Sequence, residues 1–150
     1  MEVEFGIGMD GIYFGMLEAD VIEILGSPTK RYYDDNGDLY LVYYDICTKF
    51  RFDKDDDYKL FHIDSSSDDI SIFGKKLLRV PKKDVLRLLA NKGYSDFEWE
   101  DYDYFDILYC EKLSLWITFE YDRTTGIEFF PLYDKDGDTV LWPKIPQRSN

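Results

Sequence analysis

One histidine and two cysteines are the side chains of this sequence best suited to nucleophilic catalysis. His62 is the only histidine, and Cys47 and Cys110 are the only cysteines. A hydrolytic triad needs a nucleophile, a base and an orienting acid, so Cys47 and His62 are the pair to consider. However, His62 stands between Phe61 and Ile63 in a segment typical of a β-strand, and nothing else marks a nucleophilic cysteine. The sequence favours a strand histidine on one face of a sheet, and no catalytic residue is predicted.

Patterns for binding metals are incomplete. The histidine and the cysteines lack the spacing of a zinc site. The segment Asp134-Lys-Asp136-Gly-Asp138 begins like a calcium loop, but its glycine stands fourth instead of sixth. Ile145 occupies the twelfth position, where a bidentate glutamate is needed. We interpret this segment as a hairpin turn, and the sequence predicts neither a metal nor a cofactor.

Paired carboxylates are the remaining catalytic possibility. Glycoside hydrolysis, for example, uses two acidic side chains that flank the bond being broken. The chain holds 31 Asp and Glu residues, and this abundance singles out no particular pair. An enzyme with an unrecognised carboxylate site stays open as an alternative, while the sequence predicts a protein that is not an enzyme.

Acidic and aromatic residues alternate closely in two stretches, 32–40 and 94–106. Aromatic anchors in a charged surround are how tight protein interfaces are built, and the acids would steer a basic partner towards them. The alternative is a strand that packs its aromatic side into the core while its outer face is solvated. The predicted partner-binding residues, all in the second stretch, are Asp96, Glu98, Trp99, Glu100, Asp101, Tyr102, Asp103 and Tyr104.

The charge balance limits the class of partner. The chain has 150 residues, with 18 Lys plus Arg against 31 Asp plus Glu, and therefore a formal net charge of −13. Such a field repels phosphate groups, which argues against nucleic acid and against an anionic membrane as partners. Because 45% of the residues are hydrophobic, the chain can bury a core and is not a disordered acidic tail. The charge favours a basic protein as the partner, and it leaves the oligomeric state open.

Targeting signals are missing from the sequence as given. The first eight residues have neither a basic region nor a sustained apolar region, so they do not form a signal peptide. No stretch approaches the 18 or more apolar residues that a membrane-spanning helix needs. Two cysteines are too few for a disulfide framework. We expect a cytoplasmic protein with free thiols.

An internal duplication organises the chain. Residues 20–25 and 84–89 share the pattern Asp-Val-apolar-charged-apolar-Leu, 64 residues apart. Both segments place apolar residues at helical spacing, and both are followed by glycine, Gly26 in the first and Gly93 in the second. The sequence therefore predicts one helix in each half of the chain.

Strand-like runs follow each predicted helix. The runs, rich in aromatic and β-branched residues, are 39–44, 48–52 and 59–63 in the first half and 106–110, 113–121 and 126–131 in the second. In the longest run, Leu115, Ile117 and Phe119 alternate with polar residues or Trp116, which predicts one buried face. We predict an α+β fold of two tandem αβββ repeats, 1–66 and 67–150. They form an antiparallel sheet with helices packed on one face, as one compact unit.

The first predicted helix also carries a family resemblance. Gly15-Met16, Asp20-Val21 and Leu25-Gly26-Ser27-Pro28 resemble the Gly-Met, Glu/Asp-Val, Leu-Gly-x-Pro opening of a known repeat. That repeat occurs in β-lactamase-inhibitor-protein-like domains and in small lipoproteins of the outer-membrane barrel-assembly machinery. The match covers residues 12–28 and is poorer in the second half, where Gly74-Lys75 replaces Gly-Met. The resemblance implies a helical opening followed by antiparallel strands, on a scaffold that binds other proteins.

These observations lead to one preferred function and a second from another class. The preferred function is a cytoplasmic, acidic binding protein, in its concrete form a bacterial immunity protein that neutralises a basic, nuclease-type toxin. The alternative is an envelope or assembly module like the lipoproteins, although this chain lacks their anchor cysteine. An exposed acidic and aromatic surface would favour the binding protein, whereas a deep pocket with perturbed carboxylates would favour an enzyme.

Overall fold

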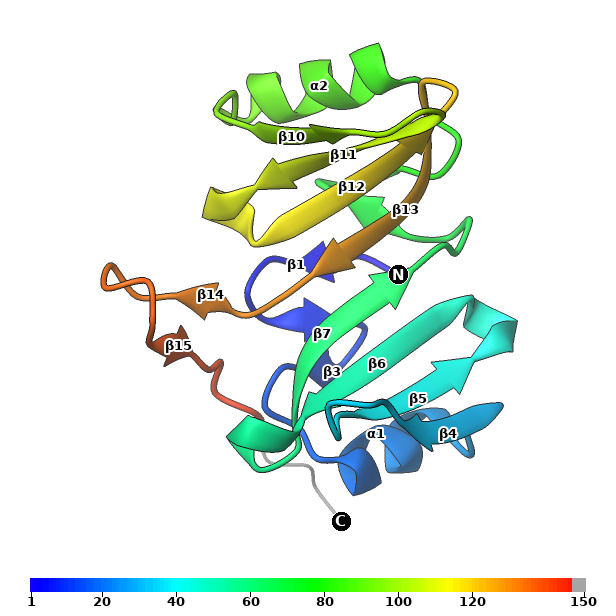
Figure 1. Ribbon diagram of the computed structural model, residues 1–150, viewed down its shortest axis with the longest axis vertical. Helices are drawn as coiled ribbons and strands as arrows, with labels where there is room; N and C mark the ends of the chain where they lie inside the picture. The colour runs from blue at the N-terminus through cyan, green and yellow to red at the C-terminus, as the bar shows by residue number, and fades with distance from the viewer. Residues whose placement is uncertain (147–150) are drawn as a thin grey trace.

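The computed structural model describes residues 1–146 and is built around an eight-stranded antiparallel sheet (Figure 1). Residues 147–150 of the second predicted repeat lie outside the described part. In spatial order the strands are β10 (Glu98–Asp101), β11 (Phe105–Cys110), β12 (Leu115–Glu120), β13 (Arg123–Phe129), β7 (Lys59–Ser65), β6 (Thr48–Asp53), β5 (Leu39–Tyr43) and β4 (Lys30–Tyr33).

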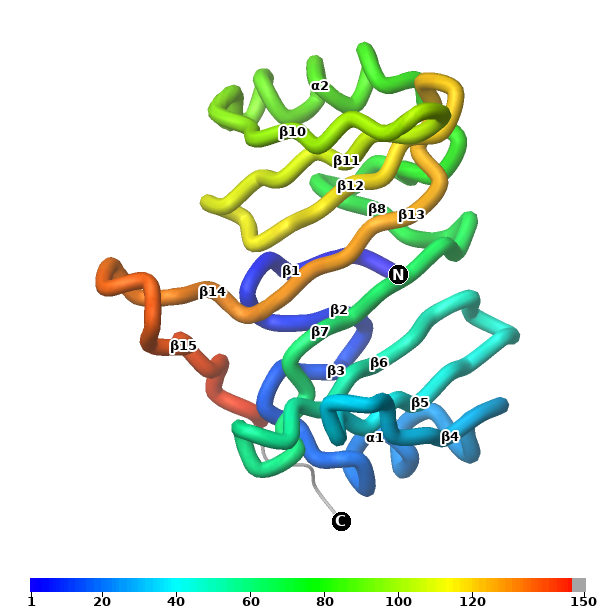
Figure 2. Tube along the Cα trace, viewed as in Figure 1, coloured from blue at the N-terminus to red at the C-terminus, as the bar shows by residue number. Residues whose placement is uncertain are grey.

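Two helices and three small sheets complete the structure. The helices are α1 (Glu18–Leu25) and α2 (Lys82–Asn91), with short 3-10 turns η1 (Tyr44–Ile46), η2 (Lys54–Asp56) and η3 (Glu111–Leu113). The small sheets are formed by β1 (Val3–Glu4), β2 (Gly8–Met9) and β3 (Ile12–Tyr13), by β8 (Ser71–Ile72) and β9 (Lys75–Lys76), and by β14 (Leu132–Tyr133) and β15 (Val140–Leu141). In Figure 2, β1 to β3 pass behind the centre of the large sheet.

The predicted α+β class with αβββ repeats is wrong, because the fold is mainly β. Each helix is followed by four strands of the large sheet instead of three, and short strands flank both helices. The unexpected strands, β4 and β10, form the two edges of the sheet and expose all four of their residues. An edge strand of this kind buries no apolar side chain, so it has no period-two hydrophobic pattern to reveal it.

The large sheet is continuous across the predicted repeat boundary. Strand β7 pairs with β13, with Asp64 opposite Glu128 and Ile63 opposite Phe129. These two strands lie side by side at the centre of Figure 1. The division into units 1–66 and 67–150 stays a prediction, but the strands of the two segments form a single sheet.

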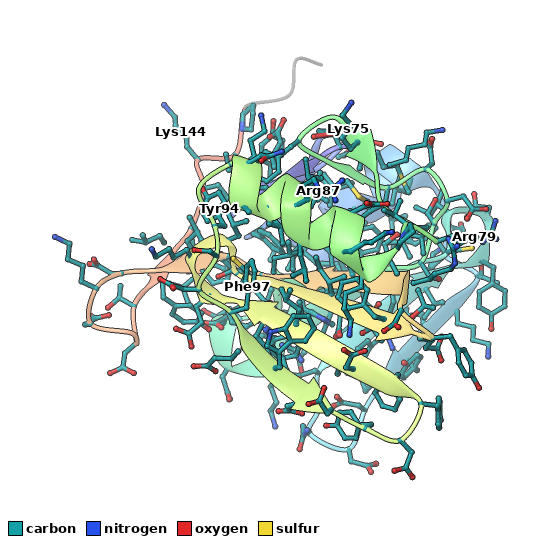
Figure 3. The ribbon with its side chains drawn as sticks, turned by 90° about the horizontal axis from the view of Figure 1, so that it is seen from above. Lys75, Arg79, Arg87, Tyr94, Phe97 and Lys144 are labelled. Carbon is teal, nitrogen blue, oxygen red and sulfur yellow. The ribbon has the colours of Figure 1, made fainter. Side chains whose placement is uncertain are left out.

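One face of the sheet carries the core. Leu115, Ile117 and Phe119 are fully buried, which confirms the alternation predicted for β12. Val21 of α1 and Val85 of α2 belong to the same hydrophobic cluster. Seen from above in Figure 3, α2 lies on one side of the second-half strands. The alternate residues of these strands therefore point to the opposite face, which we call the open face.

Candidate partner-binding surface

The predicted partner-binding residues lie on the edge strand β10 and on the loops at its two ends. Residues 98–101 are all exposed, and they pair only with β11. Asp96 precedes the strand, and its side chain is 89% exposed. Tyr102, Asp103 and Tyr104 form the turn into β11 and are exposed as well. Every predicted residue is thus accessible to a partner to some degree.

The alternation of β10 nevertheless divides these residues between two faces. Trp99 lies opposite the fully buried Leu108, which places the indole on the core side of the sheet. There its ring centroid is 6.2 Å from that of Phe119 and 5.1 Å from the Lys82 ammonium. Trp99 therefore contacts the first residue of α2. It does not belong to the same surface as its neighbours Glu98 and Glu100.

Glu98 and Glu100 point to the open face. They lie opposite Tyr109 and Ile107 of β11, respectively. The Tyr102 hydroxyl donates a hydrogen bond to Glu100, and this contact is the main cause that raises the pKa of Tyr102. Burial, followed by a hydrogen bond to Glu100, raises the pKa of Tyr109 to about 12. Both phenols therefore stay neutral hydrogen-bond donors at physiological pH.

The remaining predicted residues lie beside a second turn, between β12 and β13, which was not predicted to be part of the binding surface. Phe105, the first residue of β11, pairs with Glu120, the last residue of β12, so the β10–β11 and β12–β13 turns lie at the same end of the sheet. Tyr102 is 50% exposed, Tyr104 59% and Tyr121 85%. We call this surface the tyrosine end, and it consists of Asp101, Tyr102, Asp103, Tyr104, Tyr121 and Asp122.

The turn that presents Tyr121 is conformationally unfavourable. Tyr121 and Asp122 have φ angles of +50° and +60°, a region that suits glycine and asparagine far better than tyrosine. The residue types at 122–126 are typical of a turn, whereas Arg123 already begins β13. Gly126, a residue type common in turns, instead pairs with Thr118 inside the sheet. The turn therefore exposes the ring of Tyr121 and holds the backbone of Tyr121 and Asp122 in a strained conformation.

A lysine sits at the base of the tyrosine end. Lys82 forms an ion pair with Asp106, and its ammonium lies 3.5 Å from Asp122. Burial works against the charge of Lys82, but the hydrogen bond to Asp106 and the nearby Asp122 outweigh it, so its pKa is raised. Lys82 therefore neutralises the charge of Asp106. Asp101 and Asp103 are exposed, and their negative charges face the solvent.

An aromatic row crosses the open face and was missed in the sequence. Ring centroids are 4.9 Å apart for Tyr109 and Trp116, 4.7 Å for Trp116 and Phe130, and 4.7 Å for Phe130 and His62. The signal was the alternation of β12, because a strand with one buried apolar face must turn Trp116 towards the other side. The row joins β11, β12 and β7 on the open face, so a partner that covered this face would contact it.

His62 lies in β7 as predicted, and its surroundings are not those of a catalytic triad. Its Nε2 is 2.9 Å from Glu128 Oε1, and its side chain is only 7% exposed. Cys47 is exposed at the end of η1, and its Sγ donates to the Tyr44 carbonyl at 3.6 Å. Burial, followed by repulsion from Glu128, raises the pKa of the neighbouring Asp64. The His62 site is a partly buried hydrogen-bonded cluster on the sheet.

The acidic loop at 134–138 forms the turn between β14 and β15. Asp136 accepts hydrogen bonds from the Thr139 hydroxyl at 2.6 Å and from the Thr139 and Asp138 amides at 2.9 Å. These bonds, led by the Thr139 hydroxyl, lower the pKa of Asp136. Within residues 1–146 no three His, Cys, Asp or Glu side chains are grouped so that they could hold a metal ion.

A groove of about 600 Å³ lies between the β14–β15 hairpin and the sheet. Phe61, Trp116 and Phe130 line the sheet side, and Tyr133 and Leu141 line the hairpin side. Glu111, Lys112, Ser114 and Asp134 also line the groove, so its aromatic surface is bordered by polar and charged side chains, and Tyr133 and Leu141 are themselves exposed. The groove therefore offers aromatic surface together with charged groups at the open face of the sheet.

Comparison with known proteins defines the fold only. No family model matches the sequence, and no curated protein matches it. The structure is similar to the crystal structure of an extracellular protein containing an SCP domain from Bacillus anthracis, with a TM-score of 0.51 and 10% sequence identity. The similarity covers 79% of this chain and 44% of that one, so this chain spans less than half of its neighbour's length. None of the helices in residues 1–146 is long and apolar enough to cross a membrane.

Proposed function

We propose that this chain is a protein-binding inhibitor without catalytic activity, and specifically a bacterial immunity protein that neutralises a basic, nuclease-type toxin. The observation that carries this proposal is the tyrosine end. It presents three exposed tyrosines among exposed aspartates, in a chain with a net charge of −13. Tyrosine is enriched at the energetic centres of protein interfaces, and acidic surroundings accelerate association with a basic partner.

The proposed mechanism is occlusion of a basic cleft. Asp101 and Asp103 would take the places that substrate phosphates occupy on the toxin, while Tyr104 and Tyr121 enter neighbouring pockets. The turn between β12 and β13 presents Tyr121 as the most exposed ring of the tyrosine end, where a pocket on the partner can enclose it. The aromatic row and the groove beside β14 would extend the contact along the open face.

The test is affinity capture with the immobilised chain from a lysate of its native organism. Captured proteins are eluted with a step from about 50 mM to about 500 mM NaCl, since screening weakens charge-steered complexes. We expect one basic protein, stoichiometric with the chain and released by salt. A column that retains nothing, or only proteins indifferent to salt, would contradict the proposal.

A matched pair of variants connects the capture to the surface. Asp101→Lys with Asp103→Lys reverses two charges at the tyrosine end. Asp35→Lys with Asp55→Lys makes the same change in net charge at exposed positions of the other half of the sheet. The first variant should lose the partner and the second should keep it.

A further inference from the structure

The region around α2 has a charge opposite to that of the whole chain. Between residues 75 and 92 the sequence contains seven of the 18 cationic residues and a single acid, Asp84. The cations are Lys75, Lys76, Arg79, Lys82, Lys83, Arg87 and Lys92. Figure 3 shows Lys75, Arg79 and Arg87 around this helix. Residues 75–92 thus carry a formal charge of +6 (seven cations and one acid) in a protein of net charge −13.

These cations border a groove between β9 and α2. Its volume is about 400 Å³, and its walls include Leu77, Val80 and Leu88. Lys75, Lys76 and Arg87 stand at its rim and are exposed, and Asp84, Val85 and Asn91 complete the lining. The groove thus combines an aliphatic floor with a cationic margin.

The cations at and near the rim are held only by weak, exposed ion pairs. Lys76 lies 3.5 Å from Asp69, Arg79 lies 3.4 Å from Asp68, and Arg87 lies 3.7 Å from Asp84. The three cationic side chains are between 71% and 78% exposed. Ion pairs of this kind contribute little to stability, so incoming carboxylates can replace them at small cost.

We propose that this groove docks an acidic segment of a second protein, with an aliphatic or aromatic side chain on the partly exposed Val80 and Leu88. The segment's carboxylates would pair with Lys75, Lys76 and Arg87. Charge complementarity identifies the occupant, and the aliphatic floor distinguishes it from nucleic acid, whose bases are bound on aromatic stacking platforms. At physiological salt the Debye length is ~8 Å, so a short segment responds to the local cations more than to the distant acids.

The groove is a separate surface from the tyrosine end and is selective for the opposite charge. The chain would therefore hold two different partners, or two oppositely charged regions of one partner. This inference does not depend on the immunity function, because it rests on other residues and is tested with other variants.

The test uses a fluorescein-labelled dodecapeptide in which Glu alternates with Leu, followed by fluorescence anisotropy. Lys75→Glu with Arg87→Glu reverses the charge of two of the three rim cations and leaves Lys76 in place. Lys135→Glu with Lys144→Glu makes the same change in net charge at positions outside the groove. We expect about tenfold weaker binding for the rim variant and less than about twofold for the control, because short-range charge pairs and not net charge determine the affinity.

Two altered probes separate the contributions of charge and apolar contact. A peptide with Gln in place of Glu and one with Ser in place of Leu should both bind more weakly than the parent. Equal affinity of the rim variant and the control would overturn the proposal, as would no binding of the parent peptide at about 1 mM, a value that corresponds to ~4 kcal/mol. Tighter binding of a single-stranded oligonucleotide would assign the groove to phosphate instead, and a rim-dependent dimer in sedimentation would assign it to a second copy.

Discussion

The imidazole of His62 and the carboxylate of Glu128, 2.9 Å apart, connect the two central strands of the sheet. The imidazole also stacks on Phe130, with ring centroids 4.7 Å apart, and is almost fully removed from solvent. Glu128→Ala would leave a buried ring nitrogen without its partner, so the free energy of unfolding should fall by about 1–3 kcal/mol in urea titrations. Glu128→Gln retains a polar partner and should cost less. An unchanged free energy of unfolding in Glu128→Ala would show that the hydrogen bond contributes nothing.

Asp64 should make the protein less stable as the pH rises. Burial, followed by repulsion from Glu128, raises the pKa of Asp64 in the folded state, so the folded chain binds a proton that the unfolded chain has already released. Between the ordinary and the raised pKa the free energy of unfolding from this group therefore falls with increasing pH. Above that window the charged carboxylate is destabilising.

Asp64→Asn is accordingly expected to stabilise the protein at pH 7, by less than about 2 kcal/mol, and to have a smaller effect at acidic pH. Asp35→Asn, at an exposed position, serves as the control and should change little. Thermal and urea unfolding across the pH range measure both variants. A destabilised Asp64→Asn protein at pH 7 would mean that the carboxylate makes a favourable contact there.

The two helices should differ in their contribution to the core. Leu89 of α2 is fully buried, whereas Leu25 of α1 packs against the core while partly exposed. Leu89→Ala should destabilise by about 2–5 kcal/mol because it leaves a cavity. Leu25→Ala should cost less, about 1–2 kcal/mol, because water can fill the space. The reverse order in urea unfolding would show that the helices pack differently.

Relieving the strain of the turn at Tyr121 and Asp122 should stabilise the protein and weaken its binding to a partner. The double variant Tyr121→Asn with Asp122→Gly has the residue types that suit the positive φ angles, and it should stabilise the protein by about 1–2 kcal/mol. The same variant removes an exposed ring from the tyrosine end, so a captured partner should dissociate faster. Asp122→Ala keeps the strain and loses the Lys82 contact, and it should not be stabilised. Urea unfolding measures these variants, and an unchanged unfolding midpoint in the double variant would rule out strain at this turn.

Charge reversal at the tyrosine end should slow association as well as weaken the complex. Asp101→Lys with Asp103→Lys should slow association with the captured partner by about tenfold and flatten its dependence on salt. Stopped-flow fluorescence measures both quantities, with the Asp35 and Asp55 variant as the control. Unchanged rates would remove Asp101 and Asp103 from the binding surface.

Buried periodic segments were predictable from the sequence, and exposed edges were not. The helices around Val21 and Val85 and the buried face of β12 follow from apolar spacing, because these residues must face the core. Strands β4 and β10 have no buried residue, and their place in the sheet is set by backbone pairing with β5 and β11. Local patterns do not record such pairing, and the mainly-β class was therefore missed.

The candidate surface was predictable only in part for a related reason. The stretch 96–104 was correctly found to be rich in exposed acids and tyrosines. Alternate residues of β10 point to opposite faces of the sheet, and Trp99 points to the core side. Which residues point to which face depends on the register of β10 against β11, which the sequence did not reveal. Tyr121 comes beside Tyr104 only because β11 and β12 pair, so the two turns are neighbours in space although they are separated in sequence.

Inhibition of the captured partner is the most direct test of the proposed immunity function. The partner's nucleic-acid cleavage is measured while the wild-type chain is added in increasing amounts, in parallel with the Asp101 and Asp103 charge-reversal variant. We expect the activity to be abolished at an equimolar amount of wild-type chain and to persist with the variant. Full cleavage in the presence of excess wild-type chain, or a partner without activity on nucleic acid, would contradict the assignment as an immunity protein against a nuclease-type toxin.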